Sequence, residues 1–362
     1  MLYTVVSPAE IFMQPPADIC EHQTPFGCVM CSRTEKGEVV ERLVTTDPFE
    51  YLKPCYSPGA LYSAEKWKRG NIIMEILKAI LLGFLQGVTE FLPISSSGHL
   101  SVFQHFFGNV GGTSSLLFTV LLHMGTLIAV FVVYYKTIWG LIVEFFSTIK
   151  DIFTGKFKWS EMNENRRMLF MFVISCVPLL FLLIPVGGDR RIMDVLGGLA
   201  DDNDILVEGV CFLFTAALLL VGSWRAKKVK ARPQIGAKSA LAVGVAQAFA
   251  AGFPGISRSG STISTGMICG VSKEYMVRYS FILGIPAILA ANVMEIKDAV
   301  ALGEQIDILP VIIGVVTAAV VGFAAIKALE WLVKIDKFKI FGYYCLVLGV
   351  VVIIAGIVEK VR

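Results

Sequence analysis

Two short polar segments interrupt strongly apolar parts of the chain, and both contain residues able to do chemistry. The first, LPISSSGHL at 92–100, holds three serines and a histidine, and the second, PGISRSGST at 254–262, holds Arg258. Glu90 lies two residues before the first segment, inside an apolar run. A buried charge is costly unless it is paired or faces water. We therefore interpret Glu90 and Arg258 as members of one site.

Both segments are suited to bind an anion such as phosphate. Each follows a helix-ending proline and precedes an apolar helix, so free backbone N–H groups and a positive dipole end point toward it. Arg258 adds a planar, permanently charged fork. Small residues that only allow close helix packing are the alternative, which explains Ser264 and Gly266 but not Arg258. The residues predicted to bind the substrate phosphate are Gln86, Ser95, Ser257, Arg258, Ser259 and Thr262.

A nucleophile and a base are predicted at the start of the helix that follows the first segment. Ser96 and His99 are three residues apart and share a helical face, as a hydroxyl nucleophile and its general base require. Glu90 has Gln86 four residues earlier on its own face. The sequence leaves open whether Glu90 orients His99, holds a divalent cation or is a structural carboxylate. We interpret His105 and His123 as structural histidines.

The elements that position these residues are membrane helices. The chain has 362 residues, 55% of them hydrophobic, and a mean hydropathy of +0.70, far above the needs of a soluble core. Runs of about 20 apolar residues cross a bilayer as helices. Two broken apolar regions, 74–110 and 238–272, predict re-entrant helical hairpins. Six full spans are expected, at 114–136, 166–187, 204–223, 275–294, 307–327 and 341–359.

The two broken regions are related by an internal repeat. Gly83, Gln86 and Pro93 recur as Gly244, Gln247 and Pro254, at a constant offset of 161 residues. Repeat 1 covers about 74–223 and repeat 2 about 238–359, and each contains one hairpin and three spans. Three spans change sides of the membrane and a hairpin does not, so the second repeat is inverted and the hairpin tips meet near the midplane. The predicted fold is all-α and polytopic.

Loop charges predict the orientation. Sixteen lysines and arginines fall in the three loops on one side, and three fall on the other side amid acidic residues. The basic loops are therefore expected to be cytoplasmic, with the site opening to the extracytoplasmic side. The net charge of +3 gives no case for nucleic acid.

Residues 1–73 form a separate, polar N-terminal extension without a signal-peptide pattern. The membrane domain is expected to be 74–362, with either Met74 as the natural start or an extension outside the working protein. Cys28 and Cys31 predict half of a zinc site or a redox pair, whereas Cys20 and Cys55 are solitary. Four cysteines in the apolar segments are small hydrophobes: Cys176, Cys211, Cys269 and Cys345.

A family resemblance rests on the same two segments. Residues 83–99, GFLQGVTEFLPISSSGH, and residues 254–262, PGISRSGST, resemble the two signature regions of the undecaprenyl-diphosphatase family, the bacitracin-resistance membrane phosphatases. The resemblance covers roughly 74–362. It implies functional roles for Gln86, Glu90, Ser96, His99, Ser257, Arg258 and Thr262, with Glu90 and Gln86 as the candidate metal ligands.

The resemblance also implies an activity. A protein of this family, in the bacterial plasma membrane, hydrolyses undecaprenyl diphosphate to undecaprenyl phosphate and phosphate, which recycles the carrier lipid of peptidoglycan synthesis and confers resistance to bacitracin. Bacitracin then competes for the lipid and does not bind the protein. Dependence on Mg²⁺ or Ca²⁺ is implied as well. A covalent phosphoserine and a direct attack by water both stay open, as does homo-oligomer formation. The alternative function is a secondary transporter or flippase for an anionic or lipid-phosphate substrate.

Overall fold

The computed structural model describes residues 19–24, 27–34, 37–45, 51, 54–62, 64–107, 116–158, 162–186, 191–198, 205–253, 255–301 and 308–361. The chain divides into two compact units, one up to Met74 and one from Glu75. The two units are described separately below.

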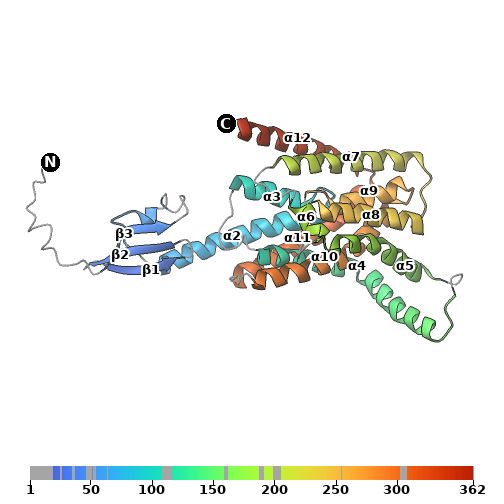
Figure 1. The fold of residues 1–362 in the computed structure, drawn as a ribbon, viewed down its shortest axis with the longest axis horizontal. Coiled ribbons are helices and arrows are strands. Elements are labelled where there is room, and N and C mark those ends of the chain that lie inside the picture. The colour runs from blue at the N-terminus through green and yellow to red at the C-terminus, as the bar shows by residue number, and fades with distance from the viewer. Residues whose placement is uncertain are drawn as a thin grey trace, which may run out of the picture. The chain divides into compact units, whose positions relative to one another are not determined.

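The N-terminal unit contains a three-stranded antiparallel sheet (Figure 1). Its strands are β1 (Ile19–Thr24), β2 (Gly27–Thr34) and β3 (Gly37–Thr45), followed by a 3₁₀ turn, η2 (Pro54–Tyr56). One face of the sheet is covered, with a small core of Val29, Cys31, Val40, Leu43 and Tyr56. The sequence interpretation did not predict this sheet. Because successive strand residues face opposite sides, Cys28 and Cys31 do not form the pair that their spacing predicted.

The second unit consists of helices (Figure 1). In chain order they are α2 (Ala64–Phe91), α3 (Ser96–Phe107), α4 (Leu116–Phe153), α5 (Glu164–Cys176), the 3₁₀ helix η5 (Val177–Leu183), α6 (Ile192–Gly197), α7 (Leu206–Lys228), α8 (Ala237–Gly252), α9 (Arg258–Ile268), α10 (Lys273–Ala301), α11 (Ile308–Lys334) and α12 (Lys339–Val361). Helix α2 begins at Ala64, ten residues before the start of the first apolar run at Met74, and therefore crosses the division between the two units.

Six segments of the described chain are long and apolar enough to cross a membrane, as predicted. They are α4, α5 together with η5, α7, α10, α11 and α12. The chain is therefore a polytopic helical membrane protein. Helix α4 is longer than expected: it bends at Tyr134 and continues to Phe153, through residues that the sequence analysis assigned to a loop. A proline, Pro178, stands where α5 gives way to the tighter η5.

The two broken regions each form a pair of helices, α2 with α3 and α8 with α9. Helices α3 and α9 have 12 and 11 residues, which at about 1.5 Å per residue is too short to cross a bilayer of about 30 Å. Helices α8 and α9 pack against each other. The re-entrant course of both pairs and the inversion of the second repeat stay predictions.

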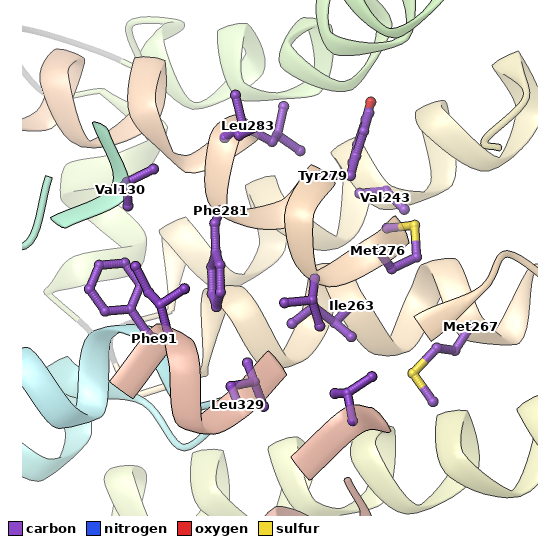
Figure 2. Close-up of a cluster of buried hydrophobic side chains, with 14 of the residues drawn as sticks. Phe91, Val130, Val243, Ile263, Met267, Met276, Tyr279, Phe281, Leu283 and Leu329 are labelled. Carbon is purple, nitrogen blue, oxygen red and sulfur yellow. The ribbon is translucent and has the colours of Figure 1, made fainter. Parts of the chain in front are cut away.

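The hydrophobic core fixes the end of α2 against the long helix α10. Phe91, the last residue of α2, packs edge-on against Phe281, with ring centroids 5.3 Å apart. Figure 2 shows this pair among the buried side chains, with Ile263 of α9 and Leu329 of α11 nearby. Since Glu90 precedes Phe91, this packing also fixes the position of the carboxylate.

Candidate active site

The two polar segments use the same type of capping hydrogen bond to start a helix. The Ser95 hydroxyl accepts a hydrogen bond from the Gly98 N–H at 3.2 Å, and the Ser257 hydroxyl accepts one from the Gly260 N–H at 3.0 Å. Both serines are therefore N-caps, a role worth about 1 kcal/mol each. Of the serines predicted to bind phosphate, these two each satisfy a backbone donor of their own helix. Ser95 does so with a left-handed backbone, φ 73°, which is costly for a non-glycine residue.

The structure brings the two segments into contact. The Ser97 hydroxyl accepts a hydrogen bond from the Gly255 N–H at 3.1 Å. The Arg258 guanidinium donates through Nη2 to Oε1 of Glu90, forming an ion pair between residues 168 positions apart. The structure therefore places Glu90 and Arg258 in contact, and their role in one functional site stays a prediction.

Glu90 is buried and accepts hydrogen bonds on both oxygens. Its Oε2 accepts from the Ser96 hydroxyl at 2.8 Å and from the Gln86 amide at 3.0 Å. His123 Nε2 lies 3.7 Å from the same oxygen. His123 is therefore a neighbour of the site rather than a remote structural residue, and the sequence analysis missed it. The nucleophile that the sequence predicted has a carboxylate, not a histidine, as its partner.

His99 does not make the predicted hydrogen bond to Ser96. Its Nδ1 donates to the Ser95 carbonyl at 2.6 Å, and its Nε2 accepts from the Tyr344 hydroxyl of α12 at 2.7 Å. The two rings stack, with centroids 5.7 Å apart and planes within 5°. Residues three apart share a helical face, but here Ser96 bonds Glu90 of α2 and His99 bonds Tyr344 of α12. Tyr344 carried no signal in the sequence.

The second segment places its other predicted residues inside the protein. Thr262 is buried, and its hydroxyl lies 2.9 Å from the Arg258 carbonyl and 2.6 Å from the Ser280 hydroxyl of α10. Ser259 is also buried, 3.4 Å from the Ser257 hydroxyl. Thr262 thus connects α9 to α10 and supports the helix that carries Arg258.

A glycine makes room for the Arg258 guanidinium. A Cβ added to Gly284 of α10 would overlap with Nη1 of Arg258 and would lie 2.9 Å from its Cζ. Nη1 is buried and has no hydrogen-bond partner in the described part of the chain. An unpaired buried donor of this kind is available to an incoming anion. A lone glycine in an apolar span gives no sign of this role in the sequence.

A second buried carboxylate lies in α7. Glu208 accepts a hydrogen bond from the Ser101 hydroxyl of α3 at 2.7 Å, and its Oε2 is buried with no partner among the described residues. The sequence analysis passed over it, although the argument that singled out Glu90, a carboxylate inside an apolar span, applies equally here.

The residues around Glu90 do not form a divalent cation site by themselves. Both oxygens of Glu90 accept from protein donors, one of them a guanidinium, and Gln86 directs its NH₂ group at the carboxylate. In the described residues, no third carboxylate, histidine or thiol joins Glu90 and His123 to complete a ligand set. Mg²⁺ and Ca²⁺ need several oxygen ligands, so a cation here would require oxygens from a bound phosphate.

Fold and site together define a class of protein: a helical membrane protein in which a partly buried serine and a partly buried arginine meet a buried carboxylate between two broken helical regions. The chain belongs to the bacitracin resistance protein BacA family, whose model matches residues 79–351.

Curated relatives cover most of this chain. The undecaprenyl-diphosphatase of Methanosphaera stadtmanae is 36% identical over 295 residues, which are 79% of this chain and 100% of that protein. That of Halothermothrix orenii is 36% identical, over 78% of this chain and 100% of its own length. That of Alkaliphilus metalliredigens is 38% identical, over 78% of this chain and 98% of its own length. The N-terminal sheet lies outside the residues that the family model matches.

Proposed function

We propose that this chain is an undecaprenyl-diphosphate phosphatase, which hydrolyses the diphosphate of the carrier lipid to the monophosphate and phosphate. The names of the relatives support the substrate and the reaction class. The contact of Ser96, Glu90 and Arg258 supports the chemistry most directly, because it joins a nucleophile, a proton acceptor and a phosphate ligand. Carrier-lipid recycling in cell-wall synthesis and resistance to bacitracin follow from this reaction.

The reaction begins when the terminal phosphate competes with Glu90 for Arg258. Nη1 of Arg258 has no hydrogen-bond partner among the described residues, so a bound phosphate can supply one. The guanidinium then binds the phosphate oxygens through two parallel N–H groups, a geometry that a lysine cannot supply. This binding releases Oε1 of Glu90 from its ion pair.

The bond changes follow from the Ser96–Glu90 hydrogen bond. Ser96 Oγ forms a bond to the terminal phosphorus, and its proton passes to Oε2 of Glu90, 2.8 Å away. The bond between that phosphorus and the bridging oxygen breaks, and the bridging oxygen leaves with the lipid monophosphate. Water then attacks the phosphorus of the phosphoserine, the bond from phosphorus to Oγ breaks, Glu90 returns its proton to Oγ, and inorganic phosphate leaves with the protons of the water. A direct attack by water, with Glu90 as its base, is the alternative route.

His99 has a positioning role in this proposal. Both of its ring nitrogens are engaged, by Ser95 and by Tyr344, so it does not take the proton of Ser96. By bonding the Ser95 carbonyl it holds the left-handed residue that starts α3 and thereby orients the hydroxyl of Ser96.

Dependence on Mg²⁺ or Ca²⁺ stays a prediction from the family resemblance, and no step above passes through a cation. If a cation is needed, it has to be held partly by the substrate. Metal-free enzyme is then expected to bind Mg²⁺ or Ca²⁺ more tightly when an isoprenyl diphosphate is present, which calorimetry can measure.

The decisive experiment measures phosphate release from an isoprenyl diphosphate by pure protein in detergent. Glu90→Gln is expected to lower kcat by about 10²–10⁴-fold, the typical worth of a general base. Ser96→Ala should be equally damaging, and Ser223→Ala, whose hydroxyl only bonds the Leu219 carbonyl, is the matched control. Retention of most turnover by Ser96→Ala excludes the covalent route. If well-folded native protein binds the isoprenyl diphosphate without releasing phosphate, the result favours the transporter function.

Sidedness is the finer part of the proposal. The basic loops are expected in the cytoplasm, with the site open to the other side. Lys337, exposed between α11 and α12, tests this. In a variant lacking the exposed Cys55, Lys337→Cys should react with a membrane-impermeant maleimide in inside-out vesicles only. Labelling of Lys337→Cys in right-side-out vesicles contradicts the proposed orientation and supports the opposite one.

A further inference from the structure

A cluster of three potential metal ligands lies in the N-terminal unit, outside the family match. Cys20, His22 and Glu38 each direct one ligand atom to a common point, and these atoms all lie within 4.8 Å of one another. His22 Nε2 is 2.7 Å from Oε2 of Glu38. Of the described residues, these three form the one group of this kind. Nothing in the phosphatase chemistry requires it.

The register of the sheet explains why these residues meet. Cys20 and His22 are two positions apart on β1 and so face the same side. Cys20 pairs with Cys31 of β2, and Glu38 of β3 pairs with Arg33, two positions further along β2 on the same face. The long carboxylate of Glu38 reaches over β2 to the two side chains of β1. Sequence spacing alone does not reveal this arrangement, because the ligands come from the two outer strands.

The three groups have the donor chemistry of a zinc site. A thiolate, an imidazole and a carboxylate are the three ligand types that Zn²⁺ takes, at about 2.3, 2.0 and 2.0–2.2 Å. A thiolate and a carboxylate together carry two negative charges, which neutralise a divalent ion. Three protein ligands leave the fourth tetrahedral position to water. A simple ion pair of His22 with Glu38 explains two of the residues, and the Cys20 thiol supplies a third donor atom within 4.8 Å of theirs.

Neighbouring groups hold the three ligands in place, as the surroundings of metal ligands usually do. The His22 ring stacks on Tyr62, with centroids 4.6 Å apart. The Tyr62 N–H donates to the Glu38 carbonyl at 2.7 Å, which ties the stacking ring to β3. The Cys20 thiol donates to the Cys31 carbonyl at 3.4 Å, a bond that is given up when the thiol loses its proton to bind a metal. All three ligands are partly buried, so they are shielded but accessible to an ion.

We propose that Cys20, His22 and Glu38 bind one Zn²⁺ ion, which ties β1 to β3 across the sheet. The site replaces the zinc half-site that the spacing of Cys28 and Cys31 predicted. Cys28 contributes nothing to it, and Cys31 belongs to the small core of the sheet.

Cobalt is the probe that tests the proposal, because Co²⁺ replaces Zn²⁺ and reports a thiolate ligand through a charge-transfer band in the near ultraviolet. The full chain in detergent, reduced and freed of metal by a chelator, should bind one Co²⁺ with this band. Zn²⁺ should displace it and Mg²⁺ should not. Cys20→Ser should abolish the band, and His22→Ala and Glu38→Gln should weaken Co²⁺ binding more than about tenfold.

Two matched variants are controls for the loss of a thiol. Cys28→Ser and Cys55→Ser also remove a thiol of the N-terminal unit and should leave the cobalt spectrum unchanged. Circular dichroism of Cys20→Ser shows whether the protein is still folded. If it is not, weaker Co²⁺ binding by folded His22→Ala supports the proposal, and unchanged binding by that variant overturns it. No band in the native chain, or a band that survives Cys20→Ser and disappears in Cys28→Ser, overturns the proposal.

Discussion

Replacement of Gly284 by alanine should disable the site without weakening the fold. The added Cβ would overlap with Nη1 of Arg258 and lie 2.9 Å from Cζ and 3.3 Å from Nη2. Non-bonded carbon atoms rest at about 3.5–4.0 Å, so the guanidinium has to move by about 1 Å. A misplacement of about 1 Å costs on the order of 100-fold in rate. At about 1.4 kcal/mol for each factor of ten, this is a loss of about 2.7 kcal/mol of transition-state stabilisation.

The fold should tolerate the change because the colliding atoms are the far end of a flexible side chain. Alanine also has a helix propensity about 1 kcal/mol better than glycine. The assay compares kcat/KM for phosphate release in detergent with the Tm of the same preparation. Gly284→Ala should lose activity at an unchanged or higher Tm. Gly266→Ala is the matched control, because its Cβ collides with the Met276 side chain and not with Arg258.

An Arg258→Lys background separates this cause from others. Lysine lacks the Nη1 branch, so the collision disappears, and Gly284→Ala should have little further effect on the weakened activity of that variant. If Gly284→Ala lowers kcat/KM by the same factor in both backgrounds, the guanidinium is not the target and the reasoning is refuted.

Three further predictions concern the surroundings of the site and the ends of the helices. Tyr344→Phe keeps the ring stack but removes the hydroxyl that bonds His99. The loss of this hydrogen bond, worth roughly 1 kcal/mol, should lower kcat/KM about fivefold. An unchanged kcat/KM excludes the positioning role of His99. Glu208→Gln keeps the acceptor for Ser101 and removes the need to bury a carboxyl, so the Tm should hold or rise, and a large fall means that the charge is required. The two lysines that bond Asp336, Lys273 and Lys227, hold the pKa of its carboxyl below the usual range. The stabilisation by these ion pairs is therefore complete above the ordinary pKa of an aspartate and is lost as the pH falls through the lowered pKa of Asp336. Asp336→Asn, which suits the left-handed backbone at this position, should lower the Tm at pH 7 and not in acid. Equal effects on the Tm at both pH values exclude the ion pairs as the cause.

The membrane helices could be predicted from the sequence because their signal is local. Long apolar runs define a span whatever surrounds them, and all six predicted spans correspond to helices that the structure describes. The extension of α4 to Phe153 was missed because basic residues such as Lys150 were assigned to a loop, whereas the structure continues the helix through them and pairs Glu144 of α4 with Arg166 of α5. The N-terminal sheet was missed since its strands are short, carry many charges and bury only one face.

The charged residues Glu90 and Arg258 could be identified from the sequence, but the hydrogen-bond partners of Ser96 and His99 could not. A charge in an apolar run signals a site by its cost, and this argument identified both Glu90 and Arg258. Which hydroxyl meets which base depends on contacts between distant helices. Tyr344 draws His99 toward α12, and Glu90 takes Ser96, although helical spacing alone favoured a pair of His99 with Ser96.

Because Glu90 is paired with Arg258, its carboxylate competes with the substrate phosphate for the guanidinium. A lipid without phosphate cannot displace it, so the resting pair rejects the bulk of the surrounding membrane. At the end of the cycle, Glu90 competes in the same way with the product phosphate. In the proposed cycle, Glu90 binds the guanidinium again once inorganic phosphate has formed, and so displaces the product. An enzyme that must hold a highly charged group firmly, yet release it on every turnover, gains from an arginine that is never left without a partner.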